Sequence, residues 1–257
     1  MAVAINSHSD KQFNDYFSQD SKSYQVYRPN YPKSLFDYLS SLVDDKNLAW
    51  DCATGNGQAA VALSNYFSHV IATDASTEQI NNAVFAPNID YRVGRAEHTD
   101  FDKGSVDLIT VAQSIHWFDL SAFYKEVNRV LKAEGILAIW TYNLLTVSPK
   151  IDAIIHQIYY DELGGFWPQQ RQIIENNCKE IDFPMLGIKT PNIEMQAHWT
   201  FEQFIGYLNT WSAVKLKQNS THKNVIFQYQ SQLHELWQDS EYKMISWPLT
   251  LKVWRKS

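Results

Sequence analysis

The first half of the chain alternates short apolar runs with stretches of helical composition, and no other feature limits the fold as strongly. We interpret the apolar runs as five strands, at 48–52, 69–74, 89–94, 105–111 and 136–142. Helices are expected between them at 59–66, at 76–84 with Ser76 as N-cap, and at 121–131. Strands that alternate with helices form parallel βαβ units with right-handed crossovers. The expected fold is therefore α/β, with a doubly wound sheet.

This regularity ends near residue 143. Helical stretches at 151–163 and 169–178, broken by Gly164-Gly165 and Pro168, indicate an inserted cap. Residues 193–200 alternate as a strand does, 201–211 and 224–237 have helical composition, and 245–254 is a final strand interrupted by Pro248. A proline is tolerated at a sheet edge or a bulge. Near the N-terminus, Pro32 suits the first turn of a helix that runs to about residue 43.

These patterns divide the chain into four segments. We expect an N-terminal helical segment that covers the site (1–45), a ligand-binding core (46–142), a helical cap and substrate region that includes one core strand at 193–200 (143–242), and a terminal core strand (243–257). The nine tryptophans include six in the last hundred or so residues, a distribution that fits either an aromatic-lined cap or a bulky core.

Composition and charge exclude several classes of protein. An apolar fraction of 45% and a charged fraction of 19% over 257 residues are those of a globular protein rather than a disordered one. A net charge of -6 argues against a nucleic-acid partner, because phosphate binding needs clustered Lys and Arg. No apolar run is long enough to span a bilayer, and residues 1–20 lack the pattern of a secretion signal. We therefore expect a cytoplasmic protein without a membrane partner.

The two cysteines, Cys52 and Cys178, show neither CxxC nor other metal-ligand spacing. This spacing predicts no metal site, and it fits a reducing compartment.

The loop that follows the first expected strand, Asp51-Cys52-Ala53-Thr54-Gly55-Asn56-Gly57, is the first candidate for a ligand site. Ligands of open parallel sheets bind beyond the carboxyl ends of the strands, and small residues let the backbone approach them. The spacing matches neither GxGxxG nor a phosphate loop, so a pyrophosphate is not the expected ligand. A plain tight turn would need similar residues. Asp74, however, ends the second strand, at the position from which a carboxylate accepts hydrogen bonds from the hydroxyls of a ribose. An aspartate at this position also suits the N-cap of the following helix.

Five blocks in this half resemble the class I S-adenosylmethionine-dependent methyltransferases, of the methyltransferase type 11-like kind and in particular the small-molecule branch that includes trans-aconitate methyltransferase-like proteins. In chain order the blocks are Tyr27-Arg28-Pro29-Asn30-Tyr31-Pro32, Asp51 to Ala60, Thr73-Asp74-Ala75-Ser76, Gly94-Arg95-Ala96-Glu97 with Phe101, and Ala112-Gln113-Ser114-Ile115-His116-Trp117-Phe118-Asp119. The resemblance implies a seven-stranded Rossmann-like methyltransferase sheet with an antiparallel last strand and helical cap insertions. It departs from the family at Ala53, where glycine is more common.

The resemblance also implies roles for single residues. Asp51, Ala53 and Gly55 would face the methionine part of S-adenosyl-L-methionine, Asp74 its ribose, and Ala96 with Glu97 its adenine edge. Gln113 would lie beside the methionine part, and His116 and Trp117 would border the methyl group. Tyr27 and Arg28 would contact the cofactor, and Tyr24 with Trp117 the acceptor. The aromatic residues among these also fit a packed core, and Arg28 also fits an anchor for the N-terminal segment.

The resemblance implies methyl transfer to a small organic acceptor, a carboxylate or a hydroxyl. Transfer from a sulfonium is an in-line displacement that depends on positioning and desolvation. A carboxylate needs no base, whereas for a hydroxyl or an amine the candidate base is His116, which is otherwise a structural histidine beside Trp117. Two alternatives remain: a non-catalytic protein that binds the cofactor as a partner, and a Rossmann-type NAD(P)-dependent oxidoreductase, whose glycine spacing is absent.

Overall fold

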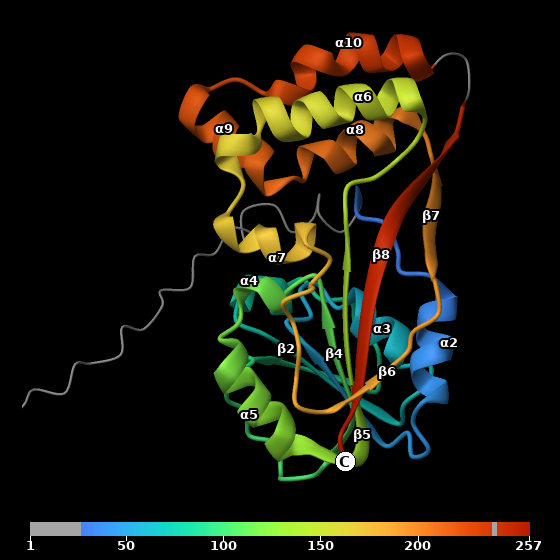
Figure 1. The fold of residues 1–257 in the computed structure, drawn as a ribbon, viewed down its shortest axis with the longest axis vertical. Helices are drawn as coiled ribbons and strands as arrows, with labels where there is room; N and C mark the ends of the chain where they lie inside the picture. Colours follow the sequence, from blue (N-terminus) through green and yellow to red (C-terminus); the bar gives the residue numbers. More distant parts are fainter. Residues whose placement is uncertain (1–26, 238–240) are drawn as a thin grey trace, which may run out of the picture.

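The computed structural model describes residues 27–237 and 241–257 (Figure 1). Within them one sheet of eight strands has the order β3-β2-β1-β4-β5-β8-β6, and β7 also pairs with β8. The strands are β1 Leu48–Cys52, β2 His69–Asp74, β3 Ile89–Val93, β4 Val106–Ala112, β5 Leu131–Tyr142, β6 Leu186–Ile188, β7 Glu194–Trp199 and β8 Lys243–Arg255. The expected α/β fold is confirmed.

The first five strands are parallel, and β8 runs antiparallel to its three neighbours. β1 lies at the centre, with β2 on one side and β4 on the other. Strand order therefore reverses at β1, and the carboxyl ends of β1 and β4 border the crevice in which such sheets bind ligands. This is the edge that carries the loop of Asp51 to Gly57 and the block that begins at Ala112.

Nine α-helices accompany the sheet in the described residues: α2 Lys33–Ser41, α3 Gln58–Leu63, α4 Thr77–Asn81, α5 Leu120–Val130, α6 Pro149–His156, α7 Gln172–Glu175, α8 Phe201–Asn209, α9 Ser212–Thr221 and α10 Val225–Trp237. Short turns of 3-10 or π-helix add η2 Ile115–Trp117, η3 Gln157–Glu162, η4 Gly164–Phe166 and η5 Gln169–Arg171.

Helices cover both faces of the sheet, as a doubly wound fold requires. On one face, α2 and α3 bury side chains such as Leu39 and Leu63 against Ala49 and other small residues of the strands. On the other face, α5 buries Phe123 and its neighbours against Trp50. Because side chains alternate along a strand, the adjacent residues Ala49 and Trp50 serve opposite layers.

A third apolar cluster lies beyond the carboxyl ends of the strands. It draws on α6, α8, α9 and α10 and includes Trp199, Trp211, Trp237 and Trp247. Figure 1 shows these helices stacked above the sheet, with β7 and β8 rising to meet them. The amino-terminal half of β8 pairs with β7 and its carboxyl-terminal half pairs with β5. One continuous strand thus joins the sheet to the helical layer, and Pro248 stands where its pairing partner changes.

Several boundaries differ from those expected. The sheet has one strand more than seven, because the three-residue β6 is too short to show a sequence pattern. Helix α9 was not expected either, since its sequence of Lys, Gln, Asn, Ser and Thr is mostly polar. The helix expected at 169–178 is only η5 followed by α7, and it ends before Asn177 and Cys178, both of which take left-handed φ angles. Ser76 does cap α4, as expected, through a bond from the Gln79 N–H.

None of the described helices is long and apolar enough to cross a membrane. Cys52 and Cys178 are both buried and unpaired. The described residues contain no group of three or more His, Cys, Asp or Glu side chains arranged to hold a metal ion.

Candidate functional site

The loop after β1 turns through three residues in the left-handed region. Their φ angles are 55° at Ala53, 58° at Gly55 and 90° at Gly57. Glycine adopts this conformation at little cost, but an L-residue pays about 1–2 kcal/mol. A Cβ at Gly57 would lie 2.2 Å from the Tyr91 hydroxyl oxygen, so this position requires glycine sterically as well. The alanine that departs from the family pattern therefore occupies a conformation that favours glycine.

Asp51, the last residue but one of β1, has a carboxylate that is almost fully buried beneath this loop. One carboxylate oxygen accepts a hydrogen bond of 2.7 Å from the Thr110 hydroxyl on β4, and the other accepts from the Thr54 hydroxyl. Burial raises the pKa of Asp51 to about 6, although both hydroxyls act against that shift. A buried carboxylate of this kind is stabilised by a cation placed beside it.

Asp74 ends β2 and holds the loop from the other side. Its two carboxylate oxygens accept bonds of 2.9 Å each from the backbone N–H groups of Gly55 and Ser76. The N-cap of α4 is Ser76 and not Asp74, so the N-cap interpretation of Asp74 is wrong. Asp74 instead joins the glycine loop to the end of the second strand.

Gln79 is a buried side chain of this region that the sequence patterns did not single out. Its Oε1 atom is inaccessible to solvent and has no hydrogen-bond partner among the described residues. It lies 3.9 Å from the point that a Cβ of Gly55 would occupy. An unsatisfied buried amide costs about 1–3 kcal/mol. A bound hydroxyl or amine beside the loop would remove that cost.

Ala96 and Glu97 follow β3. Ala96 is buried in the cluster beneath α5. Glu97 accepts a hydrogen bond of 3.0 Å from the backbone N–H of Asp119, which connects this segment to the turn after β4. The structure therefore brings Glu97 to the same edge of the sheet as the block that contains His116 and Trp117.

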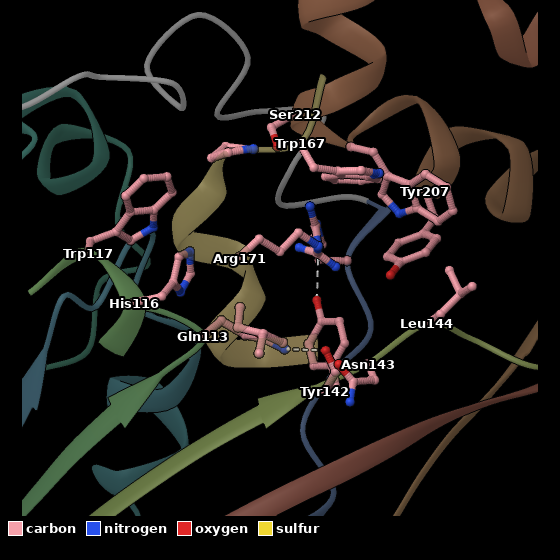
Figure 2. Close-up of a pocket in the computed structure, with 14 residues that line it drawn as sticks. Gln113, His116, Trp117, Tyr142, Asn143, Leu144, Trp167, Arg171, Tyr207 and Ser212 are labelled. Carbon is pink, nitrogen blue, oxygen red and sulfur yellow. Dashed lines mark hydrogen bonds between the residues drawn. The ribbon is translucent and has the colours of Figure 1, made fainter. Parts of the chain in front are cut away.

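Gln113 follows β4 in a left-handed conformation, with φ 60°. Its backbone N–H bonds the Trp140 carbonyl, and its Nε2 reaches the Tyr142 carbonyl at 3.4 Å. The reversed backbone turns the Gln113 side chain into a pocket that lies between the sheet and the helical layer, where Figure 2 shows the bond to Tyr142.

Residues far apart in the sequence line this pocket. His116 and Trp117 lie on one side of it, whereas Trp167 and Tyr207 lie across from them (Figure 2). Trp211 also lines the pocket. Its polar lining also includes Arg28, Gln113, Tyr142, Asn143, Arg171 and Ser212. The 14 lining side chains include two arginines and no Asp or Glu. The pocket is thus aromatic in its walls and positive in charge.

His116 packs on Trp117, with ring centroids 4.5 Å apart. Burial, with a smaller contribution from the nearby positive charge of Arg171, lowers the pKa of His116 to about 3. The imidazole is therefore neutral at physiological pH. Its Nδ1 is buried and has no hydrogen-bond partner among the described residues. The structure shows both the packing expected of a structural histidine and an imidazole nitrogen that a ligand would satisfy.

Arg28 lies against the helical layer. It donates a 3.0 Å bond to the Tyr142 hydroxyl and a longer one to the Thr210 carbonyl, and its guanidinium stands 5.3 Å above the Tyr207 ring. The ring of Tyr27 packs where a Cβ of Gly206 would stand, on α8. Both residues thus fasten the N-terminal segment to the cap, and Arg28 also lines the pocket. Tyr24 lies outside the described residues.

Arg171 is a charged pocket residue that the sequence did not reveal. It ends η5 in the cap, and no motif surrounds it. A positive side chain four residues after Trp167 was the available signal, and it is not distinctive in a chain with 14% aromatic residues.

Comparisons with known proteins agree on one family. The model of the methyltransferase domain matches residues 50–139. A protein of Dictyostelium discoideum that carries the name of a methyltransferase is 37% identical over 219 residues, which cover 84% of this chain and 83% of that one. A solved structure from Anaeromyxobacter dehalogenans, described as a methyltransferase, is 33% identical, has a TM-score of 0.83, and is matched over 98% of its length and 89% of this chain.

A more distant relative, from Saccharomyces cerevisiae, has a name that places it among the S-adenosylmethionine-dependent methyltransferases. It is 29% identical over 133 residues, which cover 48% of this chain and 45% of that one. The similarity to this protein is therefore confined to about half of each chain.

Proposed function

The chain belongs to the class I S-adenosylmethionine-dependent methyltransferase family, and from this premise we propose that it transfers the methyl group of S-adenosyl-L-methionine to a small organic acceptor that carries a carboxylate. The observation that carries the proposal is that the loop of Asp51 to Gly57 and the aromatic, positive pocket lie at one edge of the sheet. The loop supplies a cofactor site, and the pocket supplies an acceptor site.

The residues of the loop fit S-adenosylmethionine. Left-handed Gly55 leaves open space for close backbone approach, and the buried Asp51 carboxylate, whose pKa is raised, favours a cationic neighbour such as the methionine ammonium. Asp74 is fixed by the loop in the position from which it would accept the ribose hydroxyls. The unsatisfied Gln79 amide offers one further hydrogen bond to the cofactor.

The other assignments follow the motif positions. We place Ala53 with the methionine part, Ala96 and Glu97 at the adenine edge, and Gln113 beside the methionine part, where its left-handed backbone directs it. Tyr27 and Arg28 would close the cofactor site from the N-terminal side. Tyr24 stays a predicted acceptor contact, together with Trp117.

When bound, the cofactor supplies an electrophilic methyl group on a sulfonium. The protein's own contribution is to exclude water and to align the acceptor. Trp117, Trp167 and Tyr207 supply walls that exclude water and attract a cation at their ring faces. A hydroxyl acceptor would need a base, and His116 is the candidate, although its pKa of about 3 makes it a weak one; a carboxylate acceptor is already ionised and needs no base.

A carboxylate is favoured over a hydroxyl by the charges that line the pocket. Two arginines and no acidic residue surround it in the described part of the chain, and a buried positive pocket favours an anion. We also propose that the chain belongs to the small-molecule branch that includes trans-aconitate methyltransferase-like proteins. The four-segment division and the cytoplasmic location stay predictions.

The assay that tests this function measures S-adenosylhomocysteine release with matched panels of carboxylic acids and alcohols. We expect turnover with at least one acid and faster turnover with acids than with their alcohols. Cofactor binding without turnover on either panel would favour the non-catalytic partner protein. Faster turnover with alcohols would make the acceptor a hydroxyl and His116 its base.

A further inference from the structure

Arg171 occupies an unusual place in the pocket. It stands at the junction of η5 and α7, and its side chain crosses the pocket between His116 and the aromatic residues of the cap (Figure 2). Its guanidinium carbon lies 4.5 Å from the centre of the Trp167 ring and 5.6 Å from that of Tyr159. The guanidinium therefore packs beside the paired rings of Trp167 and Tyr159, whose centroids are 4.6 Å apart.

One nitrogen of the Arg171 guanidinium already makes a hydrogen bond within the protein. Nε donates a 2.7 Å bond to the Tyr159 hydroxyl, which in turn donates a 2.7 Å bond to Glu175. The direction of this relay is fixed, because burial raises the pKa of Tyr159 and keeps the hydroxyl protonated. Glu175 also lies 3.9 Å from Nε. Glu175 therefore sits beside Nε and not beside the Nη atoms of the guanidinium.

The two Nη atoms make no hydrogen bond to another described residue, although Arg171 lines the pocket. A guanidinium whose Nε is bonded and which lies over the Trp167 ring still presents donors in a planar fork, which matches a carboxylate or another planar oxyanion. His116, the nearest titratable group facing it from η2, is neutral and offers no competing charge.

We propose that Arg171 is the specificity-determining residue of this pocket, and that its Nη fork binds an anionic group of the acceptor, carboxylate in class, while Trp167 and Tyr159 hold the fork in place. That the bound anion is the methyl acceptor rests on the proposed function. The anion subsite itself depends only on residues of the cap. It makes Arg171 a binding residue, and Tyr159 and Glu175 the residues that position it.

Calorimetry tests the subsite with two small probes of equal shape, benzoate and its neutral analogue benzamide, titrated into protein saturated with S-adenosylhomocysteine. We expect the wild-type protein to bind benzoate at least about 10-fold more tightly than benzamide. In R171Q that preference should disappear. R171K, which keeps the charge but lacks the fork, should retain only part of it.

Lys150→Gln is the matched control, because it removes a positive charge from the same cap at an exposed position of α6. It should keep the full preference for benzoate. Equal binding of the two probes by the wild-type protein, failure of benzoate to bind it, or a preference that survives in R171Q would each overturn the proposal.

The same titrations separate this inference from the proposed function. Binding of S-adenosylhomocysteine is measured first for all four proteins, and intact binding by R171Q shows that the variant is folded. If the wild-type protein fails to bind S-adenosylhomocysteine but still prefers benzoate, the proposed function fails and the anion subsite stands.

Discussion

The backbone N–H of Gly55 donates a 2.9 Å hydrogen bond to the carboxylate of Asp74, across 19 positions of the chain. This bond joins the glycine loop after β1 to the end of β2. A loop that alone indicates a tight turn thereby becomes one wall of a site whose other wall is the Asp74 carboxylate.

Asp74→Asn should weaken binding of S-adenosylmethionine about 10- to 100-fold, because hydrogen bonds to a charged group contribute about 1.5–3 kcal/mol each. The asparagine keeps one acceptor for Gly55 but loses the charge. Calorimetry measures the effect. Asp90→Asn is the matched control. Asp90 and Arg92 form an ion pair within β3, the strand next to β2, and this variant should leave the affinity within about twofold of the wild-type value. Equal affinities of the two variants would remove Asp74 from the cofactor site.

Ala53→Gly should stabilise the protein, by about 0.5 kcal/mol. Relief of the left-handed alanine is worth about 1–2 kcal/mol, and the greater entropy of glycine in the unfolded chain offsets part of it. Ala62→Gly in the last turn of α3 should instead cost up to about 1 kcal/mol. Urea denaturation measures the change in the free energy of unfolding for both variants. Destabilisation by Ala53→Gly would show that the alanine is not strained.

Asp51 should make the stability of the cofactor-free protein depend on pH. Its folded-state pKa of about 6 lies above the reference value of 3.8, so the folded state binds the proton more tightly than the unfolded state. The contribution of Asp51 to stability is therefore complete below pH 4 and lost as pH rises to about 6, by about 3 kcal/mol. The difference between the unfolding free energies of wild type and Asp51→Asn should change over this interval. A difference that is constant from pH 4 to pH 7 would contradict the raised pKa.

His116→Asn distinguishes a carboxylate acceptor from a hydroxyl acceptor. With a carboxylate, kcat should fall less than about 10-fold, because no proton is transferred to the imidazole. A general base contributes about 10²- to 10⁴-fold, so a loss in that range would identify a hydroxyl or an amine as the acceptor. Since the pKa of His116 is about 3, this residue should not titrate between pH 5 and pH 8 in the wild-type protein, whichever acceptor is used.

The sheet was predictable because its information is local. β1 and β2 begin and end where the apolar runs do, and Ser76 caps α4 as its residue type suggests. β6 escaped prediction because three residues carry no periodicity, and its strand pairing depends on β8, more than 50 residues away. The polar helix α9 is similar, since packing in the cap stabilises it rather than its own composition.

The residues of the candidate site also fall into those that the sequence predicts and those that it does not. Asp51, Gly55 and Asp74 follow strands, and the topology brings the ends of parallel strands together. Arg171 and Gln79 belong to no such pattern. Arg171 reaches the pocket through the irregular path of η4, η5 and α7, and Gln79 is exceptional only because its buried amide lacks a partner among the described residues. The six C-terminal-half tryptophans serve both expected roles, with Trp167 and Trp211 in the pocket wall and Trp254 in the sheet core.

The most direct test of the account is a calorimetric titration of the wild-type protein with S-adenosylmethionine and, separately, with NADH. One molecule of S-adenosylmethionine should bind per chain, and NADH should not bind at the same concentrations. Binding of NADH in preference to S-adenosylmethionine would contradict the assignment of the Asp51 to Gly57 loop and, with it, the proposed methyl transfer.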